Sequence, residues 1–150
     1  NIVTFLSAFA LVGLARKYSA KLVHVTCLIL AAISLFLIPN ISNKYFLFAP
    51  MIGFGIAWAS MMGVPYIMVV SGIPKERYGV YMGIVNMMIV IPMILQTLSF
   101  GYIYEHFLGR NPGNVMLFAG ALLVLASLAT LRIKQTTVAD DIELPVGGGH

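Results

Sequence analysis

Four long apolar stretches without an internal charge dominate this chain, and they restrict it to a narrow set of folds. They cover about residues 22–39, 46–73, 78–104 and 115–131, and none holds Asp, Glu, Lys or Arg in its interior. A bilayer core about 30 Å thick is crossed by a helix of roughly 20 apolar residues. The four stretches come close to that length or exceed it, so the sequence predicts four transmembrane helices in an all-α bundle.

The overall composition argues against a soluble domain. Of the 150 residues, 60% are hydrophobic and 9% are charged, whereas a soluble domain carries about 25% charged residues. One core of this size cannot bury so much apolar surface, and the excess would form large exposed patches. The net charge of +4 does not indicate nucleic acid, because the basic residues flank the apolar stretches and form no single stripe.

The basic residues lie in alternate gaps between the apolar stretches, and this pattern predicts the orientation. Seven of the nine lie in the first and third gaps and after the last stretch: Arg16, Lys17, Lys21, Lys75, Arg77, Arg132 and Lys134. The second and fourth gaps hold one each, Lys44 and Arg110. Cytoplasmic loops carry the excess of Lys and Arg. We therefore expect the carboxyl terminus of the chain on the cytoplasmic side of the cell membrane.

A fifth apolar stretch, residues 2–15, is too short to span a bilayer and runs directly into the basic cluster. A secretory signal peptide carries its basic region before the apolar stretch, which is the opposite order. We expect residues 2–15 to be the cytoplasmic half of a helix whose beginning is missing. Residues 1–134 would then be the carboxyl-terminal bundle of a larger membrane protein. The polar residues 135–150 are expected to form a disordered cytoplasmic tail.

Small residues and prolines interrupt the second and third complete spans. Gly55, Ala59 and Gly63 follow one another every four residues, a spacing that lets another helix backbone approach closely. A proline inside a helix removes an amide donor and bends it, and in a bilayer the freed carbonyls need protein neighbours or a water-filled cavity. The positions predicted to allow close packing or bending are Gly53, Gly55, Gly63, Pro65, Gly79, Gly83 and Pro92.

A few polar or amphipathic side chains inside the spans are candidates for a binding site. Trp58 lies near the middle of its span, where an indole can stack on a sugar ring or simply pack against helices or lipid. The amides of Asn86 and Gln96 offer both donors and acceptors, which suits sugar hydroxyls and equally suits bonds between helices. His24, one turn inside the first complete span, is either a proton-relay group or an interfacial residue.

The sequence carries no recognisable enzyme signature. It has no Cys/His pattern with metal-ligand spacing, no phosphate-binding Gly-rich loop and no nucleophile elbow. The single cysteine, Cys27, lies in an apolar run and is interpreted as a small packing residue. Glu105 and His106 at the outer border are adjacent, so they project in different directions from a helix. We expect no enzyme activity, no cofactor and no metal.

Several short motifs together resemble one transporter family. They are the segment from Gly53 to Ser60 (Gly-Phe-Gly-Ile-Ala-Trp-Ala-Ser), then Pro65-Tyr66, Pro74, Gly79-Val-Tyr-Met-Gly83, Asn86 and Ile89-Val-Ile-Pro92. They are similar to the carboxyl-terminal half of major facilitator superfamily sugar transporters. The resemblance is to the sucrose and maltose symporter-like branch, related to the glycoside–pentoside–hexuronide:cation symporters. Residues 15–24 resemble the loop between the family's helices eight and nine.

The resemblance implies a twelve-helix fold of which this chain supplies the end of helix eight and helices nine to twelve. It implies a secondary transporter that moves a disaccharide or glycoside by alternating access with proton coupling. Its partners would be the sugar, protons, the bilayer and the amino-terminal half of the same protein, with no nucleic acid. The substrate-binding side chains would be Trp58, Ser60, Tyr66, Asn86 and Gln96. The alternatives are a major facilitator transporter of another solute and a non-transporting membrane subunit.

Overall fold

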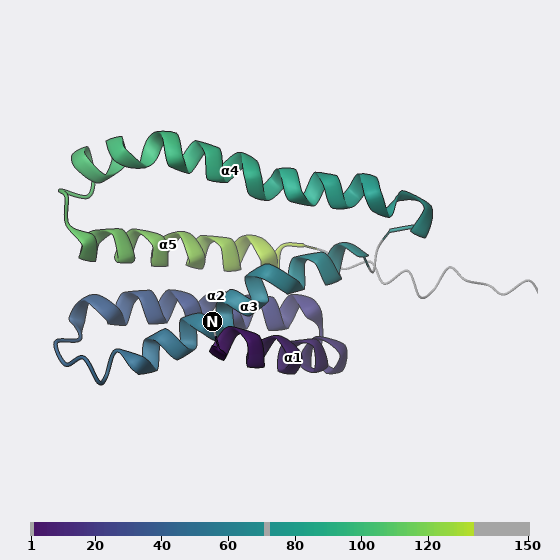
Figure 1. Ribbon diagram of the computed structural model, residues 1–150, viewed down its shortest axis with the longest axis horizontal. Helices are drawn as coiled ribbons and strands as arrows, with labels where there is room; N and C mark the ends of the chain where they lie inside the picture. The colour runs from purple at the N-terminus through teal and green to yellow at the C-terminus, as the bar shows by residue number, and fades with distance from the viewer. Residues whose placement is uncertain (1, 71–72, 134–150) are drawn as a thin grey trace, which may run out of the picture.

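The computed structural model describes residues 2–70 and 73–133, and within these ranges the chain is helical without strands (Figure 1). Four of the helices are long and apolar enough to cross a membrane, and the first helix is shorter. The prediction of an all-α bundle of one short and four long apolar helices is thus confirmed. The helices are α1 (Ile2–Lys17), α2 (Ala20–Leu37), α3 (Phe48–Val70), α4 (Tyr78–His106) and α5 (Pro112–Leu131), with two 3₁₀ turns, η1 (Ile38–Asn40) and η2 (Lys75–Arg77).

The starts of α2, α3 and α5 differ by two or three residues from the predicted boundaries, and polar side chains account for the last two. The predicted span from residue 46 begins as a helix only at Phe48, since the preceding residues form a turn in which the Asn43 side chain accepts from the Tyr45 amide at 3.0 Å. α5 begins at Pro112 rather than at residue 115, because Asn111 caps it by accepting from the Gly113 amide at 2.8 Å. The predicted tail, residues 135–150, lies outside the described residues.

Helix α2 is the centre of the bundle and packs against α3 and α5, while α1 packs against α3. Small side chains line these contacts: Ala31 of α2 and Ala57 of α3 are fully buried. A Cβ added to Gly120 of α5 would lie 2.8 Å from the ring of Phe36. Close approach of backbones through small residues is the usual way in which helices associate in a bilayer.

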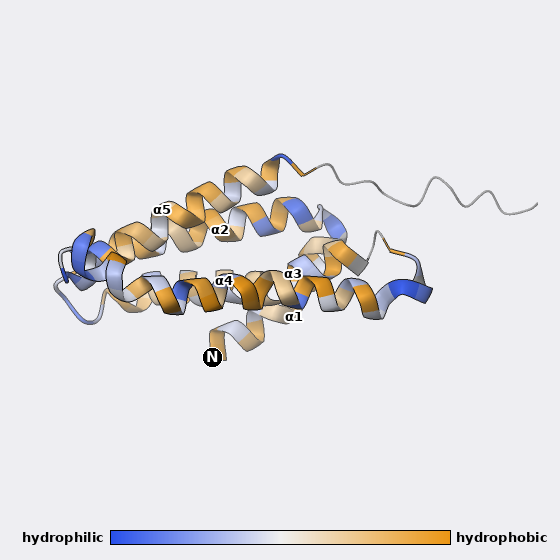
Figure 2. Cartoon of the chain, turned by 90° about the horizontal axis from the view of Figure 1, so that it is seen from above, coloured by the Kyte–Doolittle hydropathy of each residue, from blue (hydrophilic) through white to orange (hydrophobic). Residues whose placement is uncertain are grey.

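Helix α4 lies along the outside of this bundle (Figure 1). None of its residues is buried, and it contacts α3 and the η2 turn. Coloured by hydropathy, α4 is apolar along most of its length and hydrophilic at the η2 end (Figure 2). It therefore exposes an apolar surface on nearly every side, as a helix does in contact with lipid or with further helices.

The basic gaps alternate between the two ends of the bundle. The Lys21 ammonium donates to the carbonyls of Leu131 and Ile133 at 2.8 and 2.6 Å, which ties the start of α2 to the end of α5. The end of α1 and the η2 turn lie toward the same end, whereas the loops that carry Lys44 and Arg110 lie at the other (Figure 1). The long apolar helices make this a membrane-embedded protein, and its direction in the bilayer stays a prediction.

Candidate functional site

Helix α3 presents two different faces, and the predicted site residues divide between them. Trp58 is 45% exposed, and its ring lies 6.0 Å from that of Phe54, one turn earlier. Ser60 is 0% exposed, because it faces α2. Two residues along a helix correspond to a rotation of about 200°. Trp58 and Ser60 therefore point to nearly opposite sides of α3 and cannot contact the same small molecule.

Tyr66 and Asn86, two of the predicted binding residues, meet between α3 and α4. The Tyr66 hydroxyl donates to the amide oxygen of Asn86 at 2.7 Å. This bond leaves the two amide hydrogens of Asn86 and a lone pair on the Tyr66 oxygen available. Because Tyr66 is half-buried and Asn86 is exposed, the pair presents adjacent donors and acceptors at an accessible position.

Trp58 and Gln96 lie at different distances from this pair. Trp58 precedes Tyr66 by eight residues, which is about 12 Å along α3 and about 80° around it. Gln96 follows Asn86 by ten residues, roughly 15 Å along α4, and is exposed. The structure therefore associates Tyr66 with Asn86 and leaves Gln96 apart from them.

The predicted packing glycines also divide into two groups. Gly53 and Gly55 lie against other helices: an added Cβ would be 2.7 Å from the Ser34 hydroxyl of α2 at the first and 3.3 Å from Val3 of α1 at the second. At Gly63, Gly79 and Gly83 an added Cβ meets nothing within 4 Å. Pro65 lies within α3 and Pro92 within α4. Close packing at the open glycines stays a prediction.

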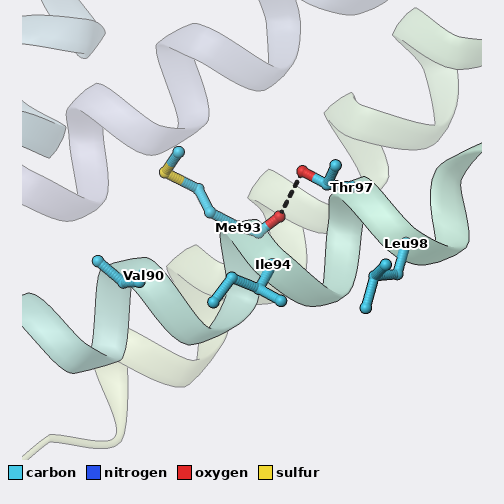
Figure 3. Close-up of a pocket in the computed structure, with 5 residues that line it drawn as sticks. All are labelled: Val90, Met93, Ile94, Thr97 and Leu98. Carbon is cyan, nitrogen blue, oxygen red and sulfur yellow. Dashed lines mark hydrogen bonds between the residues drawn. The ribbon is translucent and has the colours of Figure 1, made fainter.

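A shallow hollow of about 220 Å³ occurs on α4, and neither Tyr66 nor Asn86 lines it (Figure 3). One helix supplies its whole lining, which is Val90, Met93, Ile94, Thr97 and Leu98. The Thr97 hydroxyl already donates to the Met93 carbonyl at 2.8 Å. The hollow thus offers hydrocarbon and little hydrogen-bonding capacity, which suits an acyl chain or a side chain better than a sugar.

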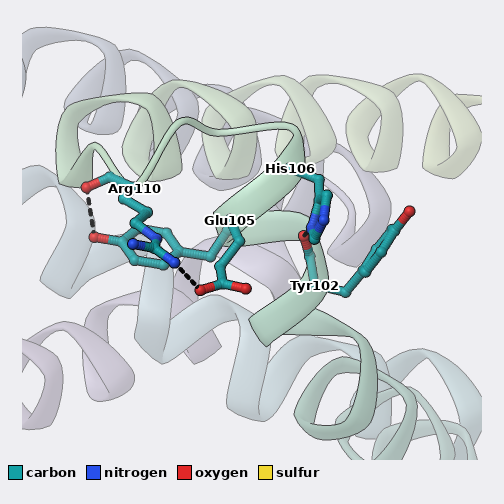
Figure 4. A network of polar contacts seen from close by, with 5 residues as sticks. Tyr102, Glu105, His106 and Arg110 are labelled. Carbon is teal, nitrogen blue, oxygen red and sulfur yellow. Dashed lines mark hydrogen bonds and ion pairs between the residues drawn. The ribbon is translucent and has the colours of Figure 1, made fainter.

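A polar network closes the turn between α4 and α5 (Figure 4). The Arg110 guanidinium forms an ion pair with Glu105, and the Tyr104 hydroxyl donates to the Arg110 carbonyl at 2.8 Å. His106 instead stacks on Tyr102, with ring centroids 4.2 Å apart, so Glu105 and His106 do project in different directions. Gly109 and Arg110 have φ values of 60° and 56°, the left-handed backbone that reverses the chain. These contacts explain the residues as parts of a turn.

The sequence did not predict that His24 and Ser60 lie against each other. The Nδ1 atom of His24 lies 3.0 Å from the Ser60 hydroxyl oxygen, within hydrogen-bonding distance, and the contact joins α2 to α3. Cys27, one turn after His24 on α2, is buried in the hydrophobic core. The three-residue spacing of His24 and Cys27 could have shown that they share a face, but not which residue of another helix lies opposite.

Comparison with known proteins identified no relative of this chain. No protein-family model, no curated protein and no solved structure matches the chain. Among the residues that the structure describes, no group of three or more His, Cys, Asp or Glu side chains could hold a metal ion. The candidate site is therefore defined by its own geometry: the Tyr66–Asn86 pair, with Trp58 two turns away on α3.

Proposed function

We propose that this chain is part of a secondary transporter of the major facilitator type that moves a sugar across the membrane. Transport would occur by alternating access, in which a site near the membrane midplane opens to one side and then to the other. A disaccharide or glycoside is the proposed substrate, and protons are the proposed coupling ions. The motifs between Gly53 and Pro92 that resemble the sugar symporters support this assignment.

The hydrogen bond between Tyr66 and Asn86 is the observation that carries the proposal. Both residues belong to the motifs that resemble the sugar transporters, and they come from different helices. A sugar needs adjacent uncharged donors and acceptors together with an aromatic face. The pair supplies the first, and the exposed ring of Trp58 on the same helix supplies the second.

The absence of charge from the spans favours a neutral solute over an ion. Helices α3, α4 and α5 contain no Lys or Arg, and Glu105, near the end of α4, is their only acidic residue. A site for an organic anion recruits a cation into the membrane, because an unpaired charge there is costly. A transporter of anionic solutes is therefore the less favoured alternative for these helices.

Uptake of labelled sucrose and maltose into proteoliposomes tests the proposal with the full-length protein. An inward proton gradient is expected to stimulate the uptake of one of them. Trp58→Ala and Asn86→Ala are expected to raise the KM about tenfold, which corresponds to about 1.4 kcal/mol of lost binding. Absence of uptake from protein that is folded and inserted would refute the assignment to sugar.

Two tyrosine variants locate the site more narrowly. Tyr66→Phe removes the hydroxyl that donates to Asn86 and is expected to raise the KM severalfold. Tyr81→Phe removes a hydroxyl from an exposed position on α4 and serves as the matched control. Equal effects of the two substitutions would remove the Tyr66–Asn86 pair from the proposed site.

A further inference from the structure

The contact between α2 and α3 contains three hydrogen-bonding groups in a mostly apolar environment. Ser60 is 0% exposed and Cys27 is 6% exposed, whereas His24 is half-buried. The Ser60 hydroxyl lies 3.0 Å from Nδ1 of His24. This contact links a partly exposed imidazole to a fully buried hydroxyl.

We propose that His24 and Ser60 form the proton-binding site of the transporter, with His24 as the residue that takes up the proton. The proposal rests on the function proposed above and identifies the residue that couples it to protons. His24 lies three residues after Lys21, whose ammonium binds the carbonyls at the end of α5. It is thus one turn inside the polar end of the bundle, where protons arrive from solution.

The hydrogen bond between His24 and Ser60 accommodates both charge states of the imidazole by reversing its direction. With the ring neutral, the Ser60 hydroxyl donates to Nδ1. With the ring protonated, Nδ1 becomes a donor to the Ser60 oxygen, and the hydroxyl turns to donate to a carbonyl one turn earlier in its own helix. One N–H bond forms, one positive charge is gained, and the hydroxyl only reorients.

Protonation of His24 is expected to weaken the packing of α2 on α3, because the surrounding elements offer no counter-ion. The elements packed on α2 present no acidic partner: the spans of α3 and α5 and residues 2–15 of α1 hold no Asp, Glu, Lys or Arg. Cys27 is the other titratable group at the contact, and Lys21 is engaged with α5. An imidazolium without a counter-ion is costly in apolar surroundings, so its formation favours separation of the helices and entry of water.

The position of Ser60 connects this event to the proposed sugar site. Ser60 lies on the face of α3 opposite to Trp58, two residues along the same helix. A movement of α3 away from α2 therefore displaces Trp58 and Tyr66. Proton binding at His24 would in this way change the proposed sugar site without direct contact between proton and sugar, so His24 acts as a positioning residue.

Transport by the full-length protein with His24→Gln tests the proposal. Gradient-driven accumulation of sugar is expected to fall at least tenfold, while exchange of labelled for unlabelled sugar, which needs no net proton movement, is retained. His106→Gln, in the turn between α4 and α5, is the matched control and is expected to keep both activities. Retention of gradient-driven accumulation by His24→Gln would overturn the proposal.

A second variant covers the case in which His24→Gln does not fold. Ser60→Ala keeps the imidazole and removes its partner, and it is expected to move the midpoint of the pH profile of uptake by about 0.5 pH unit, as loss of a weak hydrogen bond would. An unchanged midpoint would count against a proton site that includes the His24–Ser60 hydrogen bond.

A direct measurement separates this proposal from the proposed function. Nitrogen-15 NMR of histidine-labelled protein, with the His24 signal assigned by the Gln variant, reports the charge of the ring between pH 5 and 8. A His24 signal that titrates there supports the proton site even if no sugar is transported. A signal that stays neutral throughout that range overturns the proton site even if transport is observed.

Discussion

Helices α2 and α4 are both long, apolar and without internal charge, yet they differ in how much of their surface is buried. Seven of the residues of α2 are buried, whereas none of the 29 residues of α4 is. Both helices carry small or polar residues on one side. Those of α2 meet neighbours, as Ser34 meets Gly53, while Gly79 and Gly83 of α4 face open space.

This difference shows that the apolar character of a helix accounts for its insertion in the membrane but does not determine which helices it packs against. Lipid tails are as apolar as leucine side chains, so burial of hydrocarbon gives little preference for another helix over lipid. Close approach at small residues and occasional hydrogen bonds make that choice. In this chain α2 has both kinds of contact, with Gly53 and Gly120 beside it and Ser60 bonded to His24.

The strongest test of this contrast compares two glycines on its two sides. Gly120→Leu places a large side chain against the Phe36 ring, 2.8 Å from where its Cβ would lie, and is expected to destabilise the full-length protein by about 1–3 kcal/mol. Gly101→Leu, on α4, meets open space and is the control. Thermal unfolding in detergent measures both. Equal losses would show that Gly101 is as tightly packed as Gly120.

Removal of the Ser60 hydroxyl between α2 and α3 is expected to reduce stability by a smaller amount. Ser60→Ala removes the fully buried partner of His24, and the expected loss of stability is about 1 kcal/mol. Ser99→Ala on α4 removes a hydroxyl that donates to the carbonyl of Leu95 in its own helix. It should change stability far less, and a comparable loss would contradict the special role of the α2–α3 contact.

The hydrogen bond that joins α4 to α3 is expected to be weaker still. Tyr66→Phe removes the donor to Asn86 and should cost about 0.6 kcal/mol, the average for polar contacts between membrane helices. A double-mutant cycle with Asn86→Ala isolates the interaction from other effects. A coupling energy near zero would mean that this bond does not hold α4 in place.

The smallest expected effect concerns the charge at the end of α5. Lys21→Met removes an ammonium that lies against the last carbonyls of a helix, where a cation contributes roughly 0.5 kcal/mol at low ionic strength. Added salt should abolish the difference from the wild-type protein. Lys44→Met, in the loop at the other end of the bundle, is the control. A salt-independent loss would mean that the lysine stem, not its charge, stabilises α5.

Parts of the candidate site followed from sequence, and others required the fold. Tyr66 and Asn86 were both predicted as binding residues, but twenty positions separate them, and only the placement of α3 beside α4 shows that they touch. Ser60 was predicted to line the same site, whereas the structure turns it toward His24. The helical repeat already separates Ser60 from Trp58, and what faces each of them depends on the neighbouring helix.

Local sequence is sufficient to account for the helices in the described residues, their number and the alternation of basic gaps between the two ends of the bundle. These follow from local causes: the hydropathy of about 20 consecutive residues, and the caps and turns that residues such as Asn111 impose. The tertiary structure decided that α2 is central, that α4 is exposed and that His24 meets Ser60. Contacts between helices depend on shape at particular small residues, and no local hydropathy encodes that shape.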